Sequence, residues 1–168
     1  SIKEKIYTQM LTNSNDVNNN ITVLVDIITK GDAKTVNLII NTIQEIDETT
    51  SDTNIALKVL SSVANTTTNN EIKLETEQKK LVNELIETAV ISANGSEDDA
   101  LLLANVISNS DLETNEAILN SISNDTNSTL GAEVLSNLAD LDETNTIFTD
   151  TETVDQLNNF VDVIASTN

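Results

Sequence analysis

The sequence contains no cysteine, histidine, arginine, proline or tryptophan, and several of these absences exclude a class of structure or chemistry. Without cysteine there is no disulfide scaffold. Without cysteine and histidine there is no ordinary zinc site and no Ser–His or Cys–His nucleophile. Without arginine there is no bidentate phosphate clamp. These absences remove most of the usual catalytic machinery.

Glycine and aromatic residues are scarce. The three glycines are too widely spaced to form a phosphate-binding loop. A pair of carboxylates could still hydrolyse a glycoside. Such sites usually stack sugars on aromatic rings, however, and the chain has only Tyr7, Phe148 and Phe160. We therefore predict that the protein is not an enzyme.

Long apolar runs are also lacking, since none approaches the ~18 residues that a membrane helix needs. The sequence thus predicts no membrane insertion. The charge is one-sided: the formal net charge is −20, and Lys80 is the last cation. Such a surface repels nucleic acid and anionic membranes. The excess of acid indicates either a solvated acidic surface or, as the alternative, divalent-cation binding or life in a salty exterior.

One apolar pattern occurs three times between residues 100 and 144, at a step of 16 residues. In each copy, two adjacent apolar residues are followed three positions later by a third. The copies are Leu102, Leu103 and Val106; Ile118, Leu119 and Ile122; and Val134, Leu135 and Leu138. This spacing places each set on one face of a helix, with Leu103, Leu119 and Leu135 as equivalent core positions. Turn-forming residues at 109–111 and 124–128 separate the helices.

Similar stripes cover the rest of the chain. We expect helices over 2–11, 21–29, 33–46 and 71–93, and polar breaks over 13–20, 47–53, 65–70 and 140–153. Thr68 and Glu71 have the spacing of a capping box, and so do Ser96 and Asp99. Thr149 or Thr153 is expected to cap the last helix.

Most of the predicted helices are ~10–14 residues long, which is too short for stability in isolation. Each must pack against its neighbours, as in a solenoid. We therefore predict an all-α, short-helix repeat that resembles an α-solenoid and forms a single domain over 1–168. A closed helical bundle is the first alternative, and a partly disordered chain is the second.

Two acidic segments resemble the start of a calcium loop. The EF-hand requires D-x-[DN]-x-[DN]-G, and the segment that starts at Asp140 has Thr144 and Asn145 where Asp or Asn and then Gly belong. The segment from Asp150 fails as well. We predict no cofactor and no metal site; ordinary helix capping by these oxygens is favoured over weak calcium binding.

Both ends of the chain are apolar, whereas a monomeric solenoid usually ends in a polar capping repeat. The large apolar residues are Ile2, Ile6, Tyr7 and Met10 at the start, and Val154, Leu157, Phe160, Val161 and Ile164 at the end. Lys3 and Lys5 give the start the opposite charge to the acidic end. We predict that these residues mediate head-to-tail association between copies of the chain; the alternative is that Tyr7 and Phe160 fold back onto their own domain.

The expected function is that of a structural, self-assembling protein, a subunit of a filament or layer at the cell surface or outside the cell. Copies of itself, as a homo-oligomer or filament, are the predicted partners. The alternative is a helical-repeat module for protein–protein interaction, in which a groove of the repeat holds a segment of a partner.

Overall fold

A computed structural model describes residues 1–13, 16–50, 54–69, 73–93, 96–125, 128–145 and 148–167. Their regular secondary structure is entirely α-helical, without a strand, which confirms the predicted all-α class. The helices in the described ranges are α1 (Ile2–Thr12), α2 (Val17–Lys30), α3 (Ala33–Thr49), α4 (Ile55–Asn69), α5 (Thr76–Ala93), α6 (Glu97–Asn109), α7 (Leu112–Asn124), α8 (Ser128–Asn145) and α9 (Thr151–Thr167).

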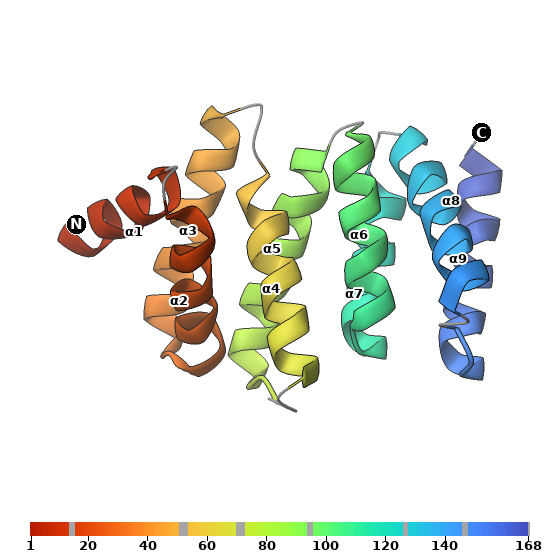
Figure 1. Ribbon diagram of the computed structural model, residues 1–168, viewed down its shortest axis with the longest axis horizontal. Helices are drawn as coiled ribbons and strands as arrows, with labels where there is room; N and C mark the ends of the chain where they lie inside the picture. The colour runs from red at the N-terminus through yellow and green to blue at the C-terminus, as the bar shows by residue number, and fades with distance from the viewer. Residues whose placement is uncertain are drawn as a thin grey trace. The chain divides into compact units, whose positions relative to one another are not determined.

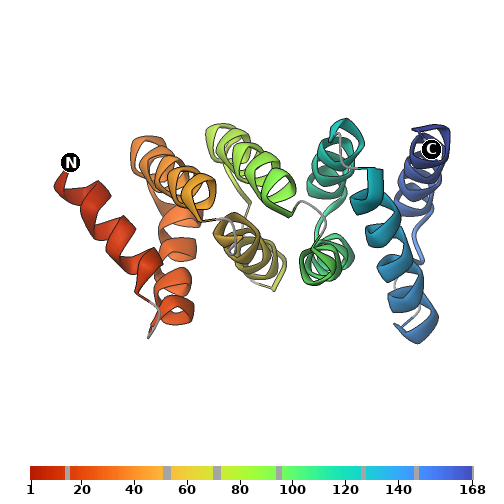
Figure 2. The same ribbon diagram turned by 90° about the horizontal axis from the view of Figure 1, so that it is seen from above.

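The chain divides into two compact units, Ser1–Ser92 and Ala93–Asn168. In the first unit, α1 packs against α2 and α3, and α2 packs against α3 and α4. Helices α2 and α4 form one layer (Figures 1 and 2). Helix α3 contacts α4 and is tied to α5, because Gln44 Nε2 donates a hydrogen bond to Thr88 Oγ1 (3.1 Å). The predicted single domain over 1–168 stays a prediction.

The second unit has the same alternation. Helix α6 packs against α8 and α7 packs against α9, while α7 and α9 also contact α8. Figure 2 shows α6 with α8 on one side and α7 with α9 on the other. Contacts to the next helix and to the next but one are those of stacked helical hairpins.

The 16-residue pattern is a packing pattern, with one correction. Leu103 and Leu119 are buried as expected, but Leu135 is only half-buried and Val134 beside it is fully buried. The buried face of α8 is a ridge with a step of four residues, Leu130, Val134 and Leu138. Since successive residues differ by about 100° around a helix, α8 presents its stripe one residue earlier than the repeat predicts.

Several helices extend into segments predicted to be polar breaks. Helix α2 begins inside 13–20, α3 and α4 run into 47–53 and 65–70, and α8 continues through 140–145. Threonine explains part of this difference. Thr49 Oγ1 donates to Glu45 O (2.9 Å) and Thr67 Oγ1 donates to Val63 O (3.0 Å). A hydroxyl that bonds the carbonyl one turn earlier is satisfied within the helix, so the polar segment need not leave it.

Side chains cap the starts of several helices. Ser96 Oγ accepts from the backbone N–H of Asp99, which confirms the predicted cap of α6. The box predicted at Thr68 is wrong, because Thr68 lies inside α4 and α5 begins only at Thr76; Glu71 lies outside the described residues. The last helix is capped by Asp150 and by neither predicted threonine.

Two caps depend on pH, Asp32 at the start of α3 and Asp150 at the start of α9. The hydrogen bond from the backbone N–H of Thr35 lowers the pKa of Asp32, and that from Thr153 lowers the pKa of Asp150. A carboxyl whose pKa is lowered by folding stabilises the helix above its unfolded pKa. That contribution is lost as the pH falls through the lowered value of the folded state.

The start of α4 is held by two buried polar side chains. The carboxylate of Asp47, at the end of α3, accepts from the backbone N–H groups of Ile55 and Ala56, both at 2.8 Å. Asn54 Oδ1 accepts from the N–H of Leu57 (2.9 Å), and Asn54 Nδ2 donates to the carbonyl of Ala89 in α5 (2.8 Å). Donors that a helix start leaves unpaired are thus satisfied by α3 and by the residue before α4.

Gln78 performs the corresponding task between α5 and α2. Its Nε2 lies 3.3–3.4 Å from the carbonyl oxygens of Ile28, Thr29 and Gly31, at the end of α2. Its Oε1 accepts from the backbone N–H of Glu75, just before α5 (2.9 Å). One buried amide therefore caps the end of one helix and the start of another.

The contact between α8 and α9 leaves no room for a side chain at Gly131. A Cβ atom at this position would lie 2.4 Å from Ile164 Cδ1 and 3.1 Å from Ile164 Cγ1. Ile164 is itself buried, so its displacement would disturb the interior of the second unit. Glycine here lets the two helices approach closely.

Asp47→Asn should lower the free energy of unfolding by about 1.5–3 kcal/mol, because a charged acceptor of two buried N–H groups is lost. The matched control is Glu48→Gln, which removes the same charge from an exposed neighbour and should change stability by less than about 0.5 kcal/mol. Urea unfolding followed by circular dichroism measures both values. Equal effects of the two substitutions would contradict the capping role of Asp47.

Gly131→Ala should destabilise the protein by about 1–3 kcal/mol through overpacking, although alanine is the better helix former. Ile164→Val removes the Cδ1 atom that the new methyl group would meet. The double variant should therefore be more stable than Gly131→Ala alone. Thermal unfolding of the two single variants and the double variant completes a double-mutant cycle. If the losses in unfolding free energy of the two single variants simply add in the double variant, the direct clash is contradicted.

Candidate functional site

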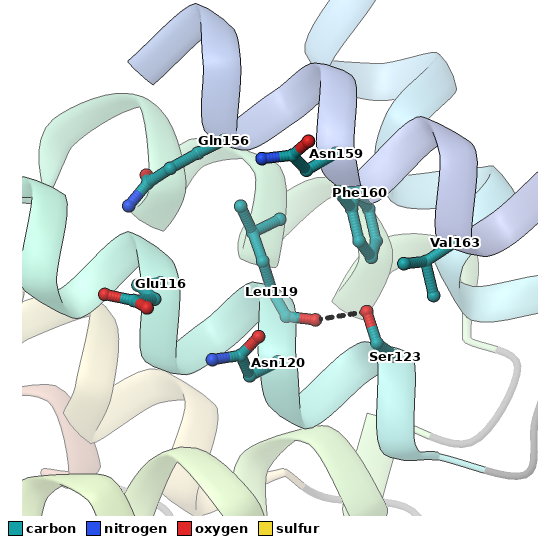
Figure 3. Close-up of a pocket in the computed structure, with 8 residues that line it drawn as sticks. All are labelled: Glu116, Leu119, Asn120, Ser123, Gln156, Asn159, Phe160 and Val163. Carbon is teal, nitrogen blue, oxygen red and sulfur yellow. Dashed lines mark hydrogen bonds between the residues drawn. The ribbon is translucent and has the colours of Figure 1, made fainter. Parts of the chain in front are cut away.

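A shallow groove of about 160 Å³ lies between α7 and α9 in the second unit. The apolar part of its lining consists of Leu119, Phe160 and Val163, of which Leu119 and Phe160 are buried (Figure 3). Ser123, also in the lining, donates its hydroxyl to the carbonyl of Leu119 (2.8 Å). The polar residues of the lining include Glu116 and Asn159, both exposed. The groove combines an apolar floor with a polar, acidic rim.

Gln156 lines the same groove and has an acceptor without a partner. Its Nε2 donates to the carbonyl of Leu112 (3.1 Å), the first residue of α7, so this hydrogen bond links α9 to the start of α7. Its Oε1 is buried and has no hydrogen-bond partner. A buried acceptor without a hydrogen bond costs free energy.

Of the residues predicted to mediate self-association on α1, one is buried and the others are exposed or half-buried. Tyr7 is buried in its own unit, whereas the side chains of Ile2 and Ile6 are 79% and 48% exposed. Met10 is half-buried. Tyr7 therefore folds back onto its own unit, as the alternative proposed.

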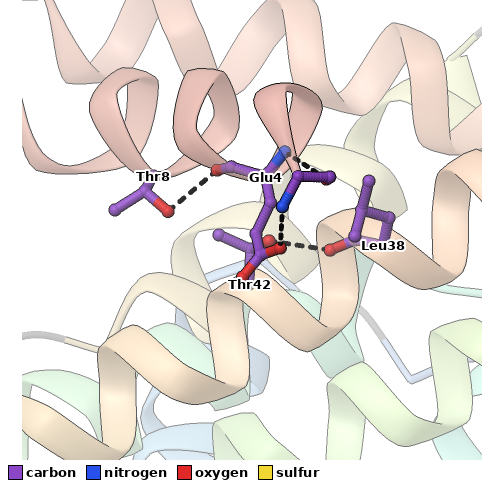
Figure 4. Close-up of polar contacts among 5 residues, drawn as sticks. Glu4, Thr8, Leu38 and Thr42 are labelled. Atoms are coloured by element: carbon purple, nitrogen blue, oxygen red, sulfur yellow. Dashed lines mark hydrogen bonds and ion pairs between the residues drawn. The ribbon is translucent and has the colours of Figure 1, made fainter.

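The exposed side of α1 is turned away from α3. Figure 4 shows Glu4 and Thr8 of α1 near Leu38 and Thr42 of α3, two helices in contact. With 100° per residue, Ile2 and Ile6 fall on the side of α1 opposite Glu4 and Thr8. We call the row of Ile2, Ile6 and Met10 the N-terminal edge. The exposed Lys3 and Lys5 flank it.

The last helix is divided in the same way. Phe160 and Ile164 are buried and are not available to another molecule, whereas Val161 is 44% exposed. Val154 and Leu157 are half-buried. We call the row of Val154, Leu157 and Val161 the C-terminal edge. By helical geometry it lies on a different side of α9 from the residues that line the groove.

Helix α9, which carries the C-terminal edge, has exposed acidic residues and no lysine. Glu152, Asp155 and Asp162 are exposed on α9. The two edges thus combine similar apolar rows with charges of opposite sign. Six of the nine predicted self-association residues are exposed or half-buried in the structure. Self-association itself stays a prediction.

Aspartates of the acidic segments considered for calcium accept hydrogen bonds from backbone N–H groups. Asp142 Oδ1 accepts from the backbone N–H of Phe148 (3.0 Å), and Asp150 Oδ1 accepts from that of Thr153 (2.8 Å). Over the described parts of the chain, no group of three or more acidic, histidine or cysteine side chains is placed to hold a metal ion. Residues 146 and 147 of the first segment lie outside the described residues.

Sequence reasoning did not find the groove. Its two sides come from α7 and α9, which are separated by the whole of α8. Asn120 and Asn159 are two of many asparagines, and no spacing distinguishes them. The pairing of α7 with α9 follows from next-but-one packing, which the repeat suggests only once the two layers are known.

In the residues that the structure describes, no helix combines the length and the apolar character needed to cross a membrane. Comparison of the chain with protein-family models, with curated proteins and with solved structures finds no match. The function therefore has to be inferred from the surfaces described above.

Proposed function

We propose that the protein is a structural subunit that associates head to tail with copies of itself. The observation that carries this proposal is the pair of edges on α1 and α9. Each is an apolar row whose side chains are exposed or half-buried in the described residues. Two different surfaces that fit each other make a heterologous contact, which extends into a filament unless it closes into a ring.

The packing within each unit supports this pairing. Helix α1 packs against α3, and α7 packs against α9, so next-but-one contacts occur in both units. The C-terminal edge lies where a further helix of this kind would pack. The N-terminal edge of a second copy offers such a helix, with Ile2 and Ile6 to fill the contact. Burial of these apolar side chains drives association.

Charge adds selectivity to the contact. Lys3 and Lys5 flank the N-terminal edge, and Glu152, Asp155 and Asp162 are exposed on the helix that carries the C-terminal edge. The pairing of unlike edges brings opposite charges together, whereas the pairing of two C-terminal edges brings acids together. Charge complementarity steers partners and suppresses the wrong pairing more than it adds affinity.

The proposal includes a non-catalytic role at the cell surface or outside the cell. The absence of histidine, cysteine and arginine supports the first part. The acidic, cysteine-free composition supports the second part, because it suits a salty exterior.

Sedimentation analysis over a wide range of protein concentration tests the proposal. The unmodified chain should associate, and Ile6→Asp or Val161→Asp should each yield a monomer of 18.2 kDa. Both substitutions fall on exposed side chains, so helix content should not change. Val23→Asp is the matched control, because Val23 is 50% exposed on α2 and belongs to neither edge.

A mixture of the two edge variants distinguishes the contact proposed from any other. Each variant retains one intact edge, so an equimolar mixture should form dimers and nothing larger. A monomeric unmodified chain up to millimolar concentration would refute the proposal. An associating chain whose edge variants also associate alone would show that the contact lies elsewhere.

A further inference from the structure

Resting on the head-to-tail contact proposed above, we propose that one face of α8 forms half of the surface that receives α1 of a second copy. We call this face the open face of α8, and it carries Ala132, Leu135, Ser136 and Ala139. Together with the C-terminal edge, it makes a seat for one helix beside both α8 and α9. The α1 helix of the second copy takes that seat as the next helix of the array.

The open face of α8 corresponds to a face of α6 that is completely covered. The α6 face consists of Ala100, Leu103, Ala104 and Ile107, each no more than 1% exposed. Two steps of the 16-residue pattern lead from these four residues to the open face of α8. There Leu135 is half-buried and the other three residues are exposed. The same helical face is therefore interior in α6 and surface in α8.

The two faces differ in which helices lie beside them. Helix α6 packs against α8, the helix two places further on. Helix α8 packs against α6, α7 and α9, and among the described residues no helix follows α9. In an array where each helix contacts the next but one, α8 thus lacks the helix that would cover its open face. A terminal helix of a second copy is the occupant that continues this packing.

The open face and the C-terminal edge lie on the same side of the α8–α9 pair. The two helices meet at Gly131 of α8 and Ile164 of α9. With about 100° per residue, Leu135 lies roughly 40° around α8 from Gly131, and Leu157 lies roughly 20° around α9 from Ile164. Ser136 lies roughly opposite the buried ridge of α8. Since α6 packs against α8 and α7 packs against α9 (Figure 2), both surfaces are turned away from the α6–α7 pair.

The C-terminal edge alone is small for a specific contact. It consists of three side chains, whereas each partner in a specific protein interface contributes roughly 20–30 residues. A helix that lies against α9 alone buries one of its sides, and a helix that lies against both α8 and α9 buries two. The open face of α8 therefore supplies apolar contact area that the proposed association needs.

Charge favours α1 of a second copy over an acidic segment. The second unit provides both parts of the seat, and residues 93–168 contain neither lysine nor arginine. Every lysine of the chain therefore belongs to the first unit, and Lys3 and Lys5 are exposed on α1 itself. Complementary charge steers α1 to the seat and disfavours a contact between two second units.

Cysteine cross-linking tests the position of α1 directly, because the chain contains no cysteine of its own. Ile6→Cys marks the N-terminal edge and Ser136→Cys marks the open face. Cysteine behaves as a small apolar residue, so both surfaces should be preserved. An equimolar mixture of the two variants, treated with a short bismaleimide, should yield a covalent heterodimer that mass spectrometry identifies.

The matched control for this experiment is Asn120→Cys. Asn120 is exposed on α7, one step of the 16-residue pattern before Ser136. Mixed with Ile6→Cys, this variant should yield about tenfold less heterodimer, because only docked residues have an effective concentration in the millimolar range.

Ser136→Lys measures what the open face contributes to affinity. Its long charged side chain obstructs the seat and repels Lys3 and Lys5, so the dissociation constant from sedimentation should rise about tenfold or more. Asn120→Lys makes the same change in charge on α7 and should change the dissociation constant by less than about twofold. Circular dichroism should show the same helix content for both variants.

The possible failures are distinguishable. If the chain associates, but Ser136→Lys has no effect and Ser136→Cys cross-links no better than its control, the role of α8 is overturned and the head-to-tail contact stands. Stronger cross-linking from Asn120→Cys would place α1 beside α7 and would also overturn the role of α8. An unmodified chain that stays monomeric would refute both this inference and the proposed function.

Discussion

The start of α4 depends on a carboxylate that belongs to another helix. Asp47 is 8% exposed, and its two oxygens accept the N–H groups of Ile55 and Ala56. Short helices are marginal alone, and the backbone groups at their ends need hydrogen-bond partners. The first unit meets this constraint with buried side chains that link the end of one helix to the start of another, as Gln78 does for α2 and α5. The side chains of Asp47 and Gln78 therefore cap helix ends and connect neighbouring helices at the same time.

The apolar stripes carried most of the information about the fold. They predicted helices and their order correctly, because periodicity of 3–4 residues reflects burial directly. Helix ends were predicted less well. Asp47 and Thr67 belong to predicted breaks, yet the first is a buried cap and the second bonds back to Val63. The same residue types favour turns or helix ends according to which backbone groups lie near them, and that depends on tertiary contacts.

The candidate surfaces could be predicted only in part, because burial depends on tertiary contacts. An apolar residue in a terminal helix can face the core or the solvent. The predicted self-association residues include both kinds, because the sequence alone does not separate them. Phe160 and Ile164 fill the interior, and Gly131 makes room for Ile164. Val161 remains outside. The groove depends on the juxtaposition of α7 and α9, which has no signature in one sequence.

Native-state hydrogen exchange tests most directly whether buried side chains from elsewhere hold the helix ends. The amides of Ile55, Ala56 and Leu57 belong to the first turn of α4, where amides ordinarily exchange freely. The hydrogen bonds to Asp47 and Asn54 predict that these three amides exchange as slowly as those of Leu60 and Val63 in the middle of the helix. Rapid exchange at 55–57 beside slow exchange at 60 and 63 would contradict the account.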